Sequence, residues 1–164
     1  MVFVTVGNAT QQFRRLLDAI DLAAESGSFV SDPVFIQSGH NPDFQSRRCE
    51  VKQFVSMDEF ENLMAEANLI ICHGGCTQLH AIRLGKVPVV MPRRKKYREH
   101  VNDHQLELVS ALASERKIVP AYEVEDLAAA IAEARRLNRQ PIPVSQSPMI
   151  SLVAQAIDEL ARGV

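Results

Sequence analysis

A glycine pair near the middle of the chain has the composition of a loop that binds an anion. Residues 73–77 read His-Gly-Gly-Cys-Thr and follow the apolar run 69–72. Adjacent glycines let the backbone approach a ligand closely, and Thr77 can cap a following helix while it offers a hydroxyl. Because amides at a helix N-terminus point outward at the positive end of the helix dipole, this segment predicts a phosphate site. A tight turn without a ligand is the alternative.

A second glycine segment, Gly7-Asn8-Ala9-Thr10, follows the apolar run at residues 2–6. A glycine followed by small polar residues ahead of a helix also presents free amides to a phosphate. The segment does not match the glycine pattern of dinucleotide-binding proteins. An ordinary strand-to-helix turn with Thr10 as the N-cap is an equal alternative.

Charge and hydrogen-bonding groups concentrate in residues 92–105. The basic run Arg93-Arg94-Lys95-Lys96-Tyr97-Arg98 could meet a diphosphate, an anionic membrane surface or nucleic acid, or it could be a solvated loop. Asp103-His104-Gln105 opens the next predicted helix, where Asp and Gln could bind adjacent sugar hydroxyls. The alternative for Asp103 is an acid that complements the helix dipole.

Residues 72–80 contain two cysteines and two histidines, which raises the question of a metal site. Structural zinc sites usually use paired Cys-x-x-Cys ligands, whereas Cys72 ends an apolar strand, where a thiol more often packs as a small core residue. His100 and His104 have an i, i+4 spacing but lack the acid of the zinc-protease motif. We therefore expect no metal.

The composition is that of one globular domain. Of the 164 residues, 46% are hydrophobic and 23% are charged, which is unlike a disordered chain. The net charge of -2 offers no general attraction to nucleic acid, so none is expected as a partner. Three cysteines fit free thiols in a reducing, cytoplasmic setting. With no signal peptide and no apolar run near the ~20 residues of a membrane span, we expect a soluble protein.

Short apolar runs alternate with amphipathic segments along the chain. Strands are expected at residues 2–6, 34–37, 51–55, 69–72, 87–91 and 117–119. Helices are expected at residues 12–24, 57–67, 77–84, 101–113, 124–137 and 150–162, the second capped by Ser56. This α/β pattern predicts a Rossmann-like doubly wound parallel sheet, which binds ligands beyond the carboxyl ends of its strands. Loops 7–10, 38–40, 73–77 and 92–105 should converge there.

The order of these features resembles the C-terminal domain of family 28 glycosyltransferases, a MurG-like family. The segments that carry the resemblance include Val4-Thr-Val-Gly7, Ile36-Gln-Ser-Gly39, Phe54-Val-Ser-Met57, Ala67-Asn-Leu-Ile-Ile-Cys-His-Gly-Gly75 and His100-Val-Asn-Asp-His-Gln105. The most similar members are the small catalytic subunits of two-component enzymes of the dolichol-pathway and bacterial exopolysaccharide type. The resemblance implies half of a GT-B glycosyltransferase, namely the half that holds a UDP-sugar.

The resemblance also implies a role for each donor-binding residue. The residues that would flank the uracil are Phe54, Val55 and Met57. Those that would approach the diphosphate or ribose are His73, Gly74, Gly75, Cys76 and Thr77. Those that would hold sugar or ribose hydroxyls are Asp103, His104 and Gln105. Those that would face the cleft near the diphosphate are Gly7, Asn8 and Thr10. An inverting transfer also needs positive groups for the departing diphosphate, which helix N-termini and Arg93 or Arg94 could supply.

His80 departs from the family pattern, because many relatives place there a glutamate that binds the ribose hydroxyls. A neutral imidazole offers one donor and one acceptor instead of a bidentate acceptor. The enzyme hypothesis keeps His80 in the donor-binding set. The alternative is a non-catalytic module that binds a nucleotide-sugar and is degenerate at this position.

The resemblance further implies a membrane-anchored, acceptor-binding partner subunit, with a lipid-linked or polysaccharide acceptor. The chain would be cytoplasmic and peripheral at the inner face of the membrane through that partner, which would also supply the catalytic base. The UDP-sugar is the substrate, and no cofactor is expected. We expect the nucleotide-sugar-binding domain at residues 1–137, a proline-rich linker at 138–148 and, at 149–164, a helix that packs on the domain or docks the partner.

Overall fold

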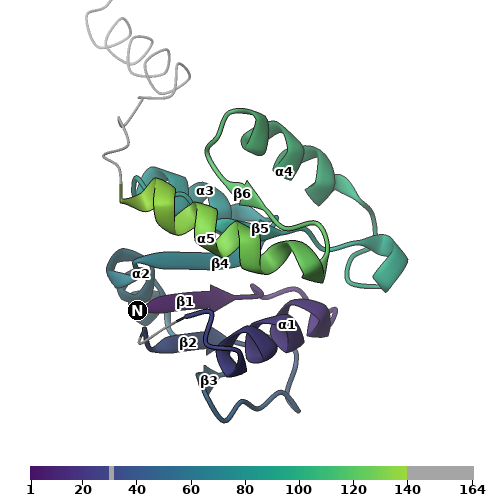
Figure 1. Cartoon of the computed structure of the whole chain (residues 1–164). Coiled ribbons are helices and arrows are strands. Elements are labelled where there is room, and N and C mark those ends of the chain that lie inside the picture. Colours follow the sequence, from purple (N-terminus) through teal and green to yellow (C-terminus); the bar gives the residue numbers. More distant parts are fainter. Residues whose placement is uncertain (30–31, 140–164) are drawn as a thin grey trace, which may run out of the picture.

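The computed structural model describes residues 1–29 and 32–139, which form a six-stranded parallel sheet covered by helices (Figure 1). The strands are β1 (Val2–Thr5), β2 (Val34–Gln37), β3 (Glu50–Lys52), β4 (Leu69–His73), β5 (Val89–Met91) and β6 (Val119–Pro120). Their order in the sheet is β3-β2-β1-β4-β5-β6, so the direction of strand succession reverses between β1 and β4. This is the Rossmann-like doubly wound topology that the sequence predicts.

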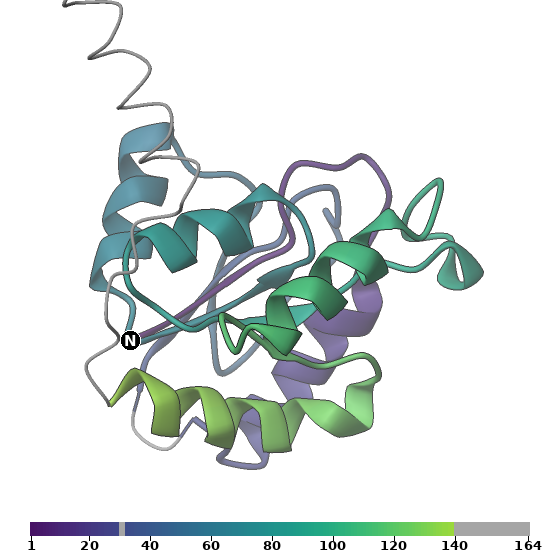
Figure 2. The ribbon, with the colours of Figure 1, turned by 90° about the horizontal axis from the view of Figure 1, so that it is seen from above.

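Helices cover both faces of the sheet. They are α1 (Arg14–Glu25), α2 (Met57–Glu66), α3 (Cys76–Arg83), α4 (His104–Ser114) and α5 (Leu127–Asn138), with short 3-10 turns η1 (Lys95–Tyr97) and η2 (Val124–Asp126). Alternate strand residues point to opposite faces, and both faces are buried, which explains the continuous apolar runs. Val4 packs in the cluster with α1 and α5, and Phe3 packs in the cluster with α2, α3 and α4. Figure 2 shows α1 and α5 on one side of the sheet and α2 and α3 on the other.

Several element boundaries differ from the sequence predictions for local reasons. β3 ends at Lys52 and not at residue 55. The neighbouring segment after β2 turns away from it at Gly39, where φ is +56°. α4 begins at His104 and not near residue 101, since Asn102 Oδ1 accepts from His104 N and holds the preceding turn outside the helix. The predicted cap of α2 is confirmed: Ser56 Oγ accepts from Glu59 N at 3.2 Å.

The C-terminal predictions fall mostly outside the described residues. Of the expected linker at 138–148, only residues 138 and 139 are described, and the helix expected at 149–164 is not. Asn138 is the last residue of α5, and its side chain accepts from Val87 N and donates to Val87 O. Asn138 thus ties α5 to the segment before β5. Within residues 1–29 and 32–139, none of the helices has the length and apolarity to cross a membrane.

Candidate functional site

A cleft of about 440 Å³ opens at the carboxyl edge of the sheet, near the switch between β1 and β4. Its volume lies within the ~300–1,000 Å³ of small-molecule sites. The segments after β1, β3, β4 and β5 and the end of β2 contribute its walls. The lining residues are Gly7, Asn8, Ala9, Gln37, Val55, Ser56, Met57, Phe60, His73, Gly75, Cys76, Thr77, His100 and Gln105. Three of the four predicted loops therefore converge, whereas loop 38–40 lies outside the lining.

A larger hollow of about 620 Å³ lies at the opposite, amino edge of the sheet, beside the start of β4. Lys86 is part of its wall, and Lys86 Nζ donates to the carbonyls of Met64, Ala65 and Ala67 at the end of α2, at 2.6, 2.5 and 2.7 Å. Because all strands are parallel, none ends with its carboxyl end at this edge. The smaller cleft is therefore where this fold places a ligand.

The N-terminus of α3 forms one wall of the cleft. Gly75 is the N-cap, so the helix begins at Cys76. Within the described part of the chain, no oxygen atom accepts from the amides of Cys76 and Thr77, and both residues line the cleft. No lysine or arginine is among the lining residues. The positive end of α3 is therefore the group that the cleft offers to an anion.

The imidazole of His73 lies between Gly7 and Gly75. A Cβ added at Gly7 would lie 2.5 Å from His73 Cε1, and one added at Gly75 would overlap His73 Nε2. Gly7 also has a φ of +71°, which favours glycine on its own. Burial and the positive charge of Arg93 lower the pKa of His73 to about 4, so the ring is neutral at pH 7. Its Nδ1 has no hydrogen-bond partner among the described residues.

Gln105 joins three segments at the cleft. Its Oε1 accepts from Gly74 N at 3.1 Å and from Arg93 N at 3.0 Å. Because both neighbours are donors, the amide oxygen must face them, which leaves Nε2 as the group that Gln105 can offer to a ligand. The structure thus places the predicted residue Gln105 in the cleft and determines its polarity: it is a hydrogen-bond donor there.

Gln37 is a lining residue that the sequence-based site did not include. It is 4% exposed, accepts from Thr5 Oγ1 at 2.7 Å through Oε1 and donates to Asn8 Oδ1 at 3.2 Å through Nε2. Thr5 Oγ1 in turn accepts from Gly7 N at 3.1 Å. This chain of bonds holds the loop after β1 against the end of β2. A polar residue at the carboxyl end of an apolar strand was the signal available for it.

His100, Ser56 and Phe60 also line the cleft without having been predicted as site residues. His100 Nδ1 accepts from Asn102 N at 3.3 Å. Ser56 and Phe60 belong to the cap and the first turn of α2, next to the predicted Val55 and Met57. The capping motif in the sequence could have indicated both residues, because it places the first turn of α2 directly after β3.

Three predicted residues lie beside the cleft and do not line it. Phe54 packs edge-on against His40, with ring centroids 5.1 Å apart. Gly74 is buried against Val109 and Gln105, and its amide is used by Gln105. Thr10 is exposed and does not cap α1, because the N-cap is Phe13. The alternative that made Thr10 the N-cap is therefore wrong, and the helix predicted from residue 12 begins at Arg14.

Arg93 is the clearest correction, because its side chain is 0% exposed. Its guanidinium donates to the carbonyls of Val6, Gln11 and Glu99, at 2.8, 2.8 and 3.1 Å. Burial lowers the pKa of Arg93 to about 10, and the nearby Glu99 opposes that effect, so Arg93 stays charged at pH 7. Arg93 fastens the loop after β1 to the segment after β5 and does not face the cleft.

The remaining predicted residues also point elsewhere. His80 Nε2 lies 3.1 Å from Glu61 Oε2 in a neighbouring hollow between α2 and α3. Asp103 Oδ1 accepts from Lys95 N at 2.9 Å, and the His104 side chain is 76% exposed. His100 precedes α4, so it does not share a helix face with His104. Within residues 1–29 and 32–139, no three His, Cys, Asp or Glu side chains gather closely enough to hold a metal ion.

The fold and the position of the cleft define a Rossmann-like, ligand-binding domain, a class that includes the C-terminal halves of GT-B glycosyltransferases. The chain matches the glycosyltransferase family 28 C-terminal domain over residues 1–160. It therefore belongs to this family, as its sequence motifs indicate. Among curated proteins, none matches the chain.

Solved glycosyltransferase structures share the fold at low sequence identity. MurG of Acinetobacter baumannii is 19% identical with a TM-score of 0.62, over 97% of this chain and 49% of that one. The glycotransferase of kitacinnamycin is 17% identical with a TM-score of 0.58, over 84% of this chain and 36% of that one. CalG4, the calicheamicin glycosyltransferase, is 16% identical with a TM-score of 0.54, over 98% and 41%. The chain thus spans less than half the length of each of these proteins.

Proposed function

We propose that this chain is the donor-binding subunit of a two-component, UDP-sugar-dependent glycosyltransferase. Its acceptor is lipid-linked or a polysaccharide and is held by a membrane-anchored partner subunit. The observation that carries the donor assignment is the pair of unpaired amides, Cys76 N and Thr77 N, at the positive end of α3 in the cleft. Family membership and the position of the cleft at the strand switch support the same assignment.

Each part of the donor has a group of matching chemistry in the cleft. The diphosphate lies against the amides at the start of α3, for which the described residues provide no acceptor. The uracil lies against the apolar wall of Val55, Met57 and Phe60. A sugar hydroxyl oxygen accepts from Gln105 Nε2, the one polar atom of that side chain free of backbone bonds.

An inverting transfer needs a base for the acceptor hydroxyl and stabilisation of the departing diphosphate. The dipole of α3 supplies the stabilisation in this proposal, since the buried Arg93 does not reach the cleft. No aspartate or glutamate is among the residues that line the cleft. The proposal therefore assigns the base to the partner subunit, which meets the cleft from its open side.

Calorimetric titration with UDP tests the donor site. Gln105→Glu keeps an oxygen for the amides of Gly74 and Arg93 but replaces the outward N–H donor with a negative oxygen. It should weaken UDP binding by about tenfold or more, because the carboxylate repels the diphosphate. His104→Ala, one residue away and exposed, is the matched control and should bind UDP like the natural protein.

Two results would decide against parts of the proposal. An absence of UDP binding at millimolar concentration would remove the donor assignment. UDP binding without transfer from a labelled UDP-sugar, in the presence of the partner subunit, would favour the non-catalytic nucleotide-sugar-binding module. His80→Glu then becomes informative, although His80 lies in the neighbouring hollow with Glu61 and would have to turn to reach the cleft.

A further inference from the structure

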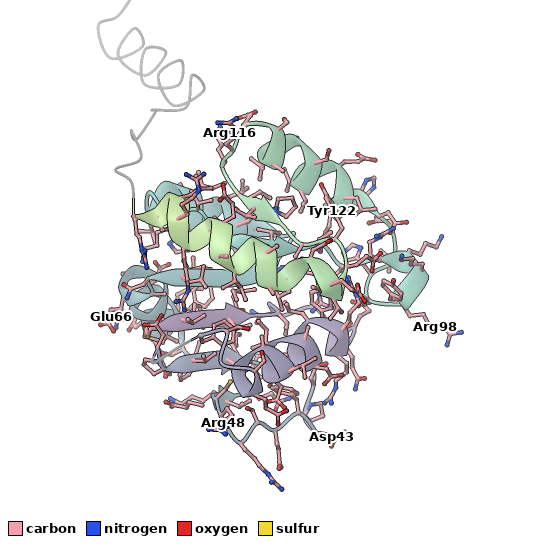
Figure 3. The ribbon with its side chains drawn as sticks, viewed as in Figure 1. Asp43, Arg48, Glu66, Arg98, Arg116 and Tyr122 are labelled. Carbon is pink, nitrogen blue, oxygen red and sulfur yellow. The ribbon has the colours of Figure 1, made fainter. Side chains whose placement is uncertain are left out.

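The segment between β5 and α4 projects beyond the carboxyl edge of the sheet in both ribbon views (Figures 1 and 2). We call residues 94–101 the basic protrusion, because they contain Arg94, Lys95, Lys96 and Arg98. Figure 3 shows Arg98 at the outer tip, with its side chain directed away from the rest of the protein. The backbone at Arg98 is left-handed, with φ of 59°, which is uncommon for a residue other than glycine. The left-handed backbone at this tip therefore depends on stabilising contacts from neighbouring residues.

Buried ionic contacts hold the base of the protrusion. Both carboxylate oxygens of Glu99 accept from Arg15 at 2.9 Å, and Oε2 also accepts from Arg94 N at 3.0 Å. Glu99 itself is 4% exposed. On the outer side, Glu123 accepts from Lys96 Nζ at 2.8 Å and from Tyr97 OH at 2.9 Å. The protrusion is therefore fixed to α1 and to the residue before η2, and its shape exists before any partner binds.

These contacts leave two cations unused at the tip. Among the residues that the structure describes, no carboxylate lies within salt-bridge distance of Lys95 or Arg98, and both side chains are exposed. Beside them, Tyr97 is 43% exposed and Val101 is 68% exposed. Cations together with protruding apolar and aromatic side chains are the chemistry of a lipid interface, where charge meets headgroups and apolar atoms enter the boundary region.

A hollow of about 310 Å³ lies between the protrusion and the start of α1. Its lining residues are Gln12, Arg14, Arg15, Tyr97, Arg98 and Glu99, so it holds three cations and one carboxylate. Arg15 is bound to Glu99, and Arg14 lies 2.9 Å from Asp18 at an exposed position. Within residues 1–29 and 32–139, Arg98 is therefore the cation of the hollow that has no acidic partner. Its size and charge suit a phosphate headgroup at the rim of the protrusion.

We propose that the basic protrusion docks an anionic lipid surface directly, with Lys95 and Arg98 against the headgroups and Val101 in the interfacial layer. A net charge of -2 confines the attraction to this site and disfavours general binding to nucleic acid. His100 belongs to the same segment and lines the donor cleft, so docking brings the mouth of the cleft beside the lipid. The docking does not depend on the proposed donor chemistry.

Sedimentation of the full chain with lipid vesicles, without UDP, tests the proposal. The protein should bind equimolar phosphatidylcholine and phosphatidylglycerol vesicles at low ionic strength and should not bind phosphatidylcholine alone. Lys95→Glu/Arg98→Glu should reduce partitioning by about tenfold or more, because each cation near an anionic surface contributes roughly a fivefold gain. Arg47→Glu/Arg48→Glu is the matched control: it makes the same charge change at exposed positions, and Figure 3 places Arg48 far from Arg98. It should keep most of the binding.

Val101→Ser separates lipid docking from a generic anion site. It should reduce vesicle binding severalfold and leave retention on polyphosphate-coated beads unchanged. The proposal is overturned if the natural chain does not bind the anionic vesicles, if both charge-reversed variants lose binding equally, or if Val101→Ser binds vesicles as well as the natural chain does. Unchanged circular dichroism of all variants shows that a loss of binding is not a loss of folding.

Discussion

Replacing Gly75 by alanine should destabilise the protein because of a single side chain, His73. The backbone at Gly75 is extended, with φ of -99° and ψ of -156°, so alanine can adopt it without left-handed strain. The added Cβ would overlap His73 Nε2. Gly7 lies close to the Cε1 side of the same ring, which limits the room into which the ring can turn. The clash therefore has one identifiable partner.

The magnitude follows from two opposing effects. Forcing one methyl group into a packed site costs about 1–3 kcal/mol. Replacing glycine by alanine also restricts the unfolded chain and stabilises the folded protein by about 0.4–1 kcal/mol where the conformation is compatible. In the natural background, Gly75→Ala should therefore lower the free energy of unfolding by about 1–2 kcal/mol. In a His73→Ala background the clash is absent, so the same change should raise it by about 0.5–1 kcal/mol.

Urea unfolding followed by circular dichroism measures this change of sign, provided that the m-value stays constant. Gly85→Ala is the control: Gly85 has a φ of +71°, and the described part of the chain places no atom within 4 Å of its missing Cβ, so the loss of stability should be the same in both backgrounds. Gly75→Ala could lower the free energy of unfolding by the same amount with and without the His73 ring, to within about 0.5 kcal/mol. In that case the ring is not the reason why position 75 needs a glycine.

Three further predictions concern His73, Arg93 and Lys86, and each is measured by urea unfolding. The pKa of His73 is about 4 in the folded protein and 6.5 ordinarily, so the unfolded chain takes up the proton first; stability should fall by up to about 3 kcal/mol as the pH drops from 6.5 to 4. A His73→Asn variant that kept the whole slope would refute this. Arg93→Met should lower the free energy of unfolding by about 3–5 kcal/mol, because it removes the donors from three backbone carbonyls, two of them in buried contacts, and removes the cation near Glu99; a loss below about 1 kcal/mol would contradict that role. Lys86→Met should cost about 1–2 kcal/mol and speed amide exchange in the last turn of α2, whose carbonyls Lys86 binds, whereas the nearby exposed Arg83→Met should do neither.

The fold could be predicted because its signals are local. A strand buried on both faces must be apolar at nearly every position, and a helix with one buried face must be apolar every third or fourth residue. Those two periods distinguish β1, at Val2–Thr5, from α1, at Arg14–Glu25, without knowledge of any contact. The alternation of the two then leads to a parallel sheet, and a parallel sheet places its ligand-binding loops on one edge.

The candidate site could be predicted only where a residue directly follows a strand and where its side chain has a single available direction. Gly75 and Thr77 satisfy this, because the end of β4 and the start of α3 determine their position. His80 does not satisfy this. Its spacing places it on the same helix face as Thr77, but α2 packs beside that face and the His80 side chain contacts Glu61 there. Gln37 was missed because its polarity was hidden in an otherwise apolar strand.

What the sequence by itself determined is the order of strands and helices, the edge at which their loops meet, and the family to which the chain belongs. What only the tertiary structure decided is which side of each loop faces the cleft. Arg93 and Arg98 are chemically equivalent in the same basic run, but Arg93 is buried under the loop after β1, whereas Arg98 stands at the protruding tip. The physical reason is that loop direction depends on hydrogen bonds between segments distant in sequence, such as those of Gln105 with Gly74 and Arg93, and no local pattern records those bonds.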